Sequence, residues 1–123
     1  MGSVALMTDG QMTIGELKER VHGLCLSKGW GDEGVQNPQH VAMAMTVEMA
    51  ELLEHFQWLA PEGVDKLLRG EDPGRAAMIG EEFADVMMYG LQLMRALHID
   101  VTAQILRKIE IVRGRDYSSD APR

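Results

Sequence analysis

The stretch VAMAMTVEMAELL, residues 41–53, constrains the fold of this chain more than any other. It predicts a helix with apolar side chains on every face, which is typical of a helix enclosed by protein. The only charged residues in it are Glu48 and Glu51, which lie one helical turn apart and project from the same face. An unpaired carboxylate in a dry core costs several kcal/mol, so we expect a cation to compensate both.

A second apolar stretch, IGEEFADVMMYGLQLM, repeats this pattern, and neither stretch contains a lysine or an arginine. One such acid pair is common on a solvated helix face, but two pairs in nearly uncharged helices favour a metal site. If the two helices pack antiparallel, four carboxylates converge and supply the oxygen ligands that Mg²⁺ prefers. We therefore predict a Mg²⁺ site, in which Mn²⁺ could substitute, with the ligands Glu48, Glu51, Glu82 and Asp85.

The rest of the chain predicts further helices and no strands. Thr13 and Glu16 fit a capping box at the start of an amphipathic helix, and Asp100 fits the cap of the last helix. We predict an all-α fold, a four-helix bundle with a short extra helical turn between its second and third helices. The predicted segments are a flexible leader (1–12), one domain (13–117) and a flexible tail (118–123), with long helices at 13–28, 39–59, 75–98 and from 101 onward.

Charge and composition limit the partners. The chain has 12 basic and 19 acidic residues, a net charge of −7, and such a surface repels nucleic acid. Acidic residues interrupt every apolar stretch well before the length of a membrane span. Cys25 is the single cysteine, which argues against a disulfide framework and favours the cytoplasm. The second and third helices are apolar on more faces than one bundle can cover, which favours a homodimer or a dimer of dimers.

The two acid pairs also carry a resemblance to a known family. The segment EMAELLEHFQW from Glu48, followed by EFADV from Glu82, resembles the MazG-type all-α nucleoside triphosphate pyrophosphohydrolases, and within them the small dCTP pyrophosphatase branch. The resemblance implies that the acid pairs bind Mg²⁺ and that the enzyme cleaves a nucleoside triphosphate to the monophosphate and pyrophosphate. It also implies that Lys108 contacts phosphate and that Trp30 and Trp58 help to wall the base pocket.

Several positions depart from that branch. His40 and Val112 stand where the branch has asparagine, and Asp116 separates Arg115 from Tyr117 where the branch has an adjacent Arg-Tyr pair. His40, Arg115 and Tyr117 are nevertheless retained as candidate substrate-binding residues. These differences leave base specificity open.

The expected reaction assigns roles to few residues. Glu51 is expected to orient or deprotonate the attacking water, with Glu54, one turn further on, as the alternative. Lys108, with Arg115, would offset the charge on the leaving pyrophosphate. The resulting hypothesis is a Mg²⁺-dependent hydrolase of a (deoxy)nucleoside triphosphate, such as dCTP or a modified dCTP, that serves nucleotide-pool housekeeping.

Two other classes of protein bury carboxylates on helices. One is a non-catalytic helical dimerisation module that keeps a metal site for stability. The other is a ferritin-like di-iron bundle, which needs paired Glu-x-x-His motifs. This chain has one such motif, from Glu19 to His22, and neither acid pair is followed by a histidine at the required spacing.

Overall fold

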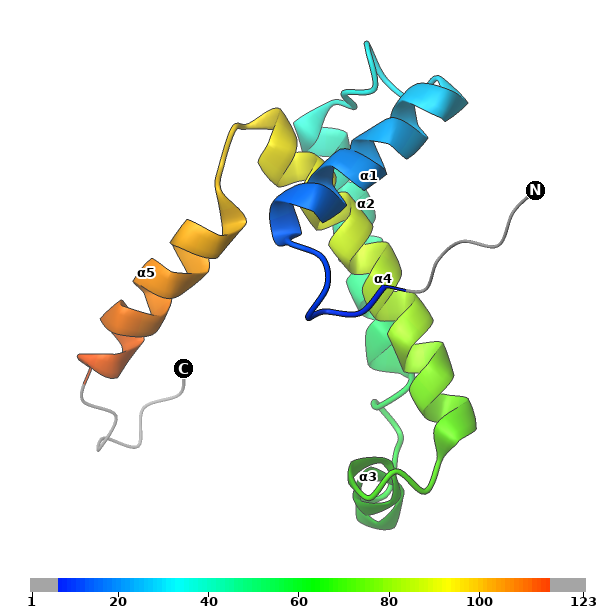
Figure 1. Cartoon of the computed structure of the whole chain (residues 1–123). Helices are drawn as coiled ribbons and strands as arrows, with labels where there is room; N and C mark the ends of the chain where they lie inside the picture. Colours follow the sequence, from blue (N-terminus) through cyan, green and yellow to red (C-terminus); the bar gives the residue numbers. More distant parts are fainter. Residues whose placement is uncertain (1–6, 116–123) are drawn as a thin grey trace.

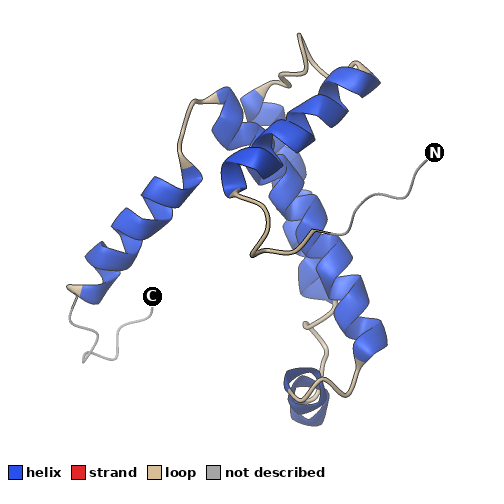
Figure 2. Cartoon of the chain, in the orientation of Figure 1, coloured by secondary structure: helices blue, strands red, loops and turns tan. Residues whose placement is uncertain are grey.

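The computed structural model describes residues 7–115 (Figure 1). Within this range the chain is helical, with no strand beyond one isolated backbone bridge between Asp32 and Val35 (Figure 2). The all-α prediction is confirmed, including the extra helix between the second and third long helices. The helices are α1 (Ile14–Lys28), α2 (Pro38–Glu54), α3 (Pro61–Leu68), α4 (Pro73–Ala96) and α5 (Val101–Arg113).

Side-chain caps set most of the helix starts. Thr13 and Glu16 form the predicted capping box of α1, and the Asp100 carboxylate accepts the backbone N–H of Ala103 as the predicted cap of α5. Asn37 caps α2 through the backbone N–H groups of Gln39 and His40. These hydrogen bonds satisfy amide groups that have no partner inside the helix.

The predicted end of the second helix at residue 59 was wrong, because α2 ends at Glu54. A turn follows it, and Nη1 of Arg75 donates to the backbone carbonyl of His55 at 3.1 Å. That contact joins the end of α2 to the first turn of α4, whose cap is the side chain of Asp72. The chain therefore reverses direction over the segment that contains α3.

The two helices that carry the acid pairs pack side by side and antiparallel, as the metal-site prediction required (Figure 1). Met45, near the middle of α2, lies against Gly90 on α4, while His55, at the other end of α2, lies against Glu82. Helix α1 packs across α4 through the buried side chains of Val21 and Cys25.

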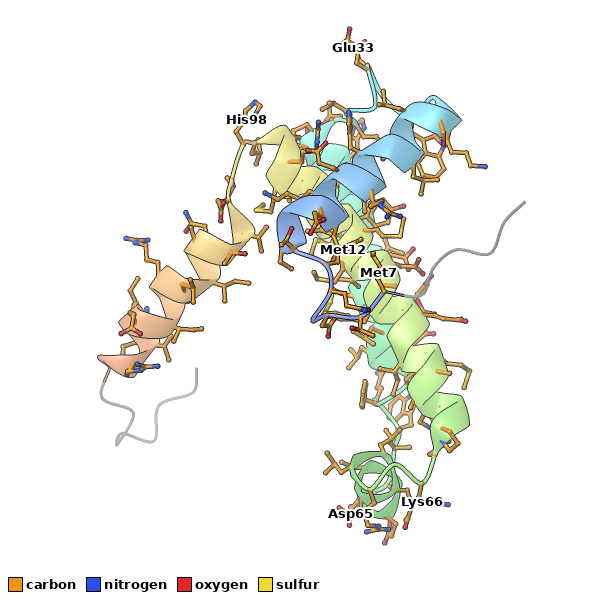
Figure 3. All side chains as sticks on the ribbon, in the orientation of Figure 1. Met7, Met12, Glu33, Asp65, Lys66 and His98 are labelled. Atoms are coloured by element: carbon orange, nitrogen blue, oxygen red, sulfur yellow. The ribbon has the colours of Figure 1, made fainter. Side chains whose placement is uncertain are left out.

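The last helix stands apart from the others. Helix α5 leaves the end of α4 after His98, whose φ is 58°, and extends away from α1, α2 and α4 (Figure 1). Among the described residues, α5 is not one of the helices that pack extensively on another helix, and its Ile105 and Ile109 are exposed. Figure 3 shows the side chains of α5 projecting around a helix that stands apart. Within one chain, the packed part of the bundle therefore consists of α1, α2 and α4.

The expectation that protein encloses the helix at residues 41–53 was wrong for a single chain. Met43 is 62% exposed and Leu53 is 54% exposed, and Val41 is the only buried residue of α2. The physical reason is that α4 covers one face of α2 while α5, which could cover another, points away. No helix in the described part is both long and apolar enough to cross a membrane.

Predictions for both chain ends fall partly outside the described residues. Residues 1–6 of the expected leader, residues 116–117 of the expected domain and the expected tail at 118–123 all lie beyond that range. Tyr117 is among them.

Candidate metal centre and adjoining cavity

Three carboxylates from two helices meet at the interface between α2 and α4. One oxygen from each of Glu48, Glu51 and Glu82 lies within 4.8 Å of the others. The spacing explains the convergence, because residues three apart project from one helix face and the antiparallel packing sets that face against α4. Asp85, one turn beyond Glu82, lies close enough for its charge to act on both Glu48 and Glu82.

The cluster has the chemistry of a divalent-cation site. Oε2 of Glu48 and Oε2 of Glu82 are buried and have no hydrogen-bond partner among the described residues. Buried carboxylate oxygens normally have a donor or a cation beside them, because their desolvation is otherwise uncompensated. An all-oxygen ligand set suits a hard cation such as Mg²⁺, Mn²⁺ or Ca²⁺. The residues present therefore fit a divalent metal ion.

Electrostatics support the same interpretation. Burial raises the pKa of Glu48 above its ordinary value, and its hydrogen bond with Glu51 together with the charges of Glu51, Asp85 and Glu82 raises it further. The pKa of Glu82 is raised by burial first and then by Glu51 and Asp85, while His55 opposes this shift. Like charges at this distance favour protonation, and a bound cation would remove that penalty.

His55 is a neighbour of the cluster that the sequence did not single out. Its Nε2 lies 3.9 Å from Oε1 of Glu82, and its side chain is only 18% exposed. The overlooked signal was its position four residues after Glu51, which places it on the same helix face.

A cavity of about 260 Å³ adjoins the carboxylates. Glu48 and Asp85 form part of its wall, and Trp30, predicted for the base pocket, forms another part. The remaining lining residues were not predicted as site residues: Gln36, Met88, Tyr89 and Gln92. Tyr89 and Gln92 follow Asp85 by one and two helical turns, so the helix period could have indicated them. Gln36 lies in the loop before α2, where periodicity gives no signal.

Other predicted site residues lie away from the cluster within this chain. Glu54 is exposed at the end of α2 and does not belong to the carboxylate cluster, and Trp58 is 87% exposed. His40 is exposed in the first turn of α2 and does not line the cavity. Lys108 lines a separate apolar groove on α5 with Ile105, Ile109, Val112 and Arg113, and Arg115 follows α5. Helix α5 points away from α2 and α4, so neither cation lies beside the carboxylates of its own chain (Figure 1).

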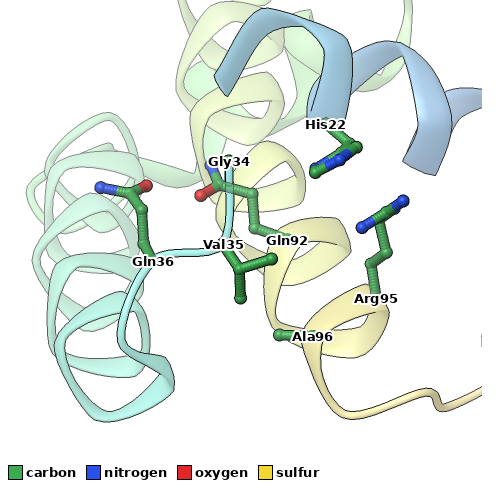
Figure 4. Close-up of a pocket in the computed structure, with 7 residues that line it drawn as sticks. All are labelled: His22, Gly34, Val35, Gln36, Gln92, Arg95 and Ala96. Carbon is green, nitrogen blue, oxygen red and sulfur yellow. The ribbon is translucent and has the colours of Figure 1, made fainter. Parts of the chain in front are cut away.

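The Glu19–His22 motif does not support the ferritin-like alternative. Both oxygens of Glu19 bond to Arg95 on α4, at 3.1 and 3.3 Å. His22 lines a different, very small pocket beside that ion pair (Figure 4). Neither residue belongs to the carboxylate cluster.

An antiparallel helix pair with clustered carboxylates at its interface defines an all-helical protein with a candidate metal centre. The sequence model of the MazG-like family matches residues 43–118, which include both acid pairs. The chain belongs to the MazG-like family.

Curated relatives and a solved structure are consistent with this assignment. The chain is 30% identical to dCTP pyrophosphatase 1 of Homo sapiens over 68% of its own length, and 28% identical to the same protein of Mus musculus. The matched region covers 48% of each relative, so the chain spans about half the length of the curated relatives it matches. A pyrophosphatase from Archaeoglobus fulgidus is 27% identical, with a TM-score of 0.69 covering 95% of this chain and 100% of that one.

Proposed function

We propose that this protein is a Mg²⁺-dependent nucleoside triphosphate pyrophosphohydrolase that releases pyrophosphate and leaves a monophosphate. The observation that carries the proposal is the pair of buried, unpartnered oxygens on Glu48 and Glu82 beside a cavity walled by Trp30 and Tyr89. The similarity to dCTP pyrophosphatase 1 supports dCTP or a modified dCTP as the substrate. Nucleotide-pool housekeeping is the role that we propose for such an activity.

The four acids would hold the metal. Glu48, Glu51, Glu82 and Asp85 would bind Mg²⁺, or Mn²⁺ in its place, together with oxygens of the substrate phosphates. When bound, the metal supplies positive charge that offsets repulsion between the triphosphate and the acids and polarises the phosphoryl group. Trp30 would pack against the base, since it lines the same cavity as Glu48 and Asp85.

Proton transfer would fall to a carboxylate of the cluster. One oxygen of Glu51 lies within 4.8 Å of an oxygen of both Glu48 and Glu82, so Glu51 can orient a water at that point and accept its proton. Glu54 remains the alternative, although its exposed position outside the cluster makes it the weaker one.

The position of α5 supports assembly of copies. Lys108 and Arg115 lie away from the carboxylates of their own chain, while exposed apolar side chains remain on both α5 and α2. We infer that α5 packs on a second copy, in a homodimer or a dimer of dimers, and that Lys108 and Arg115 act there on phosphate. His40, Trp58 and Tyr117 would join the substrate site in that assembly. Buried Cys25 fits a cytoplasmic location, as expected from the sequence.

The direct test is a substrate panel. The purified full-length chain is incubated with Mg²⁺ and a set of standard and modified nucleoside triphosphates, and pyrophosphate and monophosphate are quantified. We expect equimolar release of both from at least one deoxycytidine triphosphate, and none in excess EDTA. Release of inorganic phosphate instead, or no hydrolysis of any substrate, would contradict the proposal. The latter result, with metal binding retained, would favour the dimerisation module.

Metal binding predicts a thermal shift that does not depend on turnover. A ligand present at 100 times its dissociation constant stabilises a fold by about 2.7 kcal/mol, so Mg²⁺ should raise the melting temperature measured in EDTA by several degrees. Glu48→Gln should remove most of this shift. The matched control is Glu62→Gln, an exposed residue in α3, which should keep it. An equal shift in both variants would place the metal elsewhere.

A further inference from the structure

The cavity beside the carboxylates has a polar end that the proposed chemistry does not use. Gln92 follows Asp85 by seven positions along α4, which corresponds to a distance of about 10 Å along the helix axis. Both line the cavity, so the Gln92 end lies roughly one nucleoside length from the carboxylates. Gln36, from the loop between α1 and α2, lines the same cavity. Both glutamines also appear in Figure 4, which draws the residues of a second, smaller pocket.

The carboxamide of Gln92 is incompletely satisfied. Its Oε1 is buried and has no hydrogen-bond partner among the described residues. A buried acceptor in this state carries an uncompensated desolvation penalty, which a donor from a ligand would relieve. Gln36, which is half-buried, makes no side-chain hydrogen bond to another residue within 7–115. Two carboxamides that line one cavity and have no hydrogen-bond partner in the described residues are suited to recognising the hydrogen-bonding edge of a nucleobase.

The second, smaller pocket shares both glutamines as lining residues. It measures about 10 Å³ and is lined by His22, Gly34 and Arg95 as well as by the two glutamines. This space can hold at most one water molecule. The guanidinium of Arg95 is already bonded to Glu19. Of the two spaces, only the larger cavity has room for a planar base.

We propose that Gln36 and Gln92 determine base specificity by reading the hydrogen-bonding edge of a base that carries an exocyclic amino group. This inference rests on the proposed function, which places a nucleotide in the cavity. Oε1 of Gln92 accepts from the amino group, and the amide of Gln36 donates to the adjacent ring nitrogen. Cytosine presents this donor–acceptor order, whereas uracil reverses it, so that both carboxamides would have to turn over to accept uracil.

The test measures binding rather than turnover. The full-length protein with Mg²⁺ is titrated calorimetrically with the α,β-imido analogues of dCTP and dUTP. We expect the wild-type chain to bind the dCTP analogue at least roughly tenfold more tightly, and Gln92→Leu to reduce this ratio to near one. Gln92→Glu keeps an acceptor and should keep the preference, even if the added charge weakens both affinities.

A matched control is Gln39→Leu, the same change at an exposed position close to Gln36. It should leave the ratio unchanged. Equal binding of both analogues to the wild-type chain, binding of neither, or an unchanged ratio in Gln92→Leu would each overturn the inference. Loss of the preference in Gln92→Glu would overturn the acceptor role of Gln92. Pyrophosphate release from dCTP, measured in parallel, reports separately on the proposed function, so the two can fail independently.

Discussion

Glu51→Gln should reduce pyrophosphate release by roughly 10²- to 10⁴-fold while leaving the helical fold intact. The substitution removes a proton acceptor and one negative charge from the point where Glu48, Glu51 and Glu82 meet, but it preserves the shape of the side chain. Because Glu51 raises the pKa of both neighbouring glutamates, the metal-free variant should be at least as thermally stable as the wild-type chain. Turnover and melting temperature in EDTA are the two measurements.

Two further variants sharpen this comparison. Glu62→Gln, on the exposed surface of α3, is the matched control and should keep full turnover. Glu54→Gln separates the two candidates for the proton acceptor, because it should change turnover little if Glu51 has that role. Near-normal pyrophosphate release from Glu51→Gln would exclude Glu51 as the acceptor, and a severe loss in Glu54→Gln alone would transfer the role to Glu54.

Placing carboxylates on the apolar face of α5 should separate the assembled copies and abolish most turnover together. Ile105 is 53% exposed and Ile109 is 43% exposed, and both line the groove that contains Lys108. The double variant Ile105→Asp with Ile109→Asp buries two charges if that face contacts another copy, and such burial is strongly unfavourable. Light scattering after gel filtration should show a dimer or tetramer for the wild-type chain and a monomer for the variant.

The control for this experiment lies on the opposite side of the same helix. Ala103→Asp adds a carboxylate there and should leave both mass and turnover unchanged. Far-ultraviolet circular dichroism should report at most the loss of α5 in the double variant, because α1, α2 and α4 pack on one another without it. A wild-type chain that is monomeric at assay concentration, or a double variant that stays assembled and active, would contradict the inferred assembly.

Local rules explain which parts of the fold were predictable. Thr13 and Asp100 cap their helices through hydrogen bonds within a few residues, so their side-chain chemistry indicated the helix starts. The approach of Glu48 to Glu82 followed from helix period and antiparallel packing. The direction of α5 depends on the backbone after α4, where His98 has a positive φ that sequence patterns do not specify. The enclosure of α2 was overestimated because an apolar surface does not reveal which chain covers it.

The candidate site likewise contains residues that the sequence could predict and residues that it could not. Carboxylates inside apolar helices are conspicuous in a sequence, whereas Gln92 resembles any polar residue on a long helix until its neighbours are known. Gln36 reaches the cavity only because of the loop conformation between α1 and α2. Trp58 and His40 entered the prediction as family positions rather than from periodicity, and within this chain they lie outside the cavity.

The glycine at position 34, which shares the small pocket with His22, restricts how this protein could acquire a new substrate preference. Its φ is +78°, and a Cβ built there would lie 2.8 Å from Cε1 of His22, so both backbone and space oppose any larger residue. A substitution at this position would displace the loop that carries Gln36 rather than simply reshape the cavity. Directed evolution toward other bases should therefore accumulate changes at Gln36 and Gln92 themselves and leave Gly34 untouched.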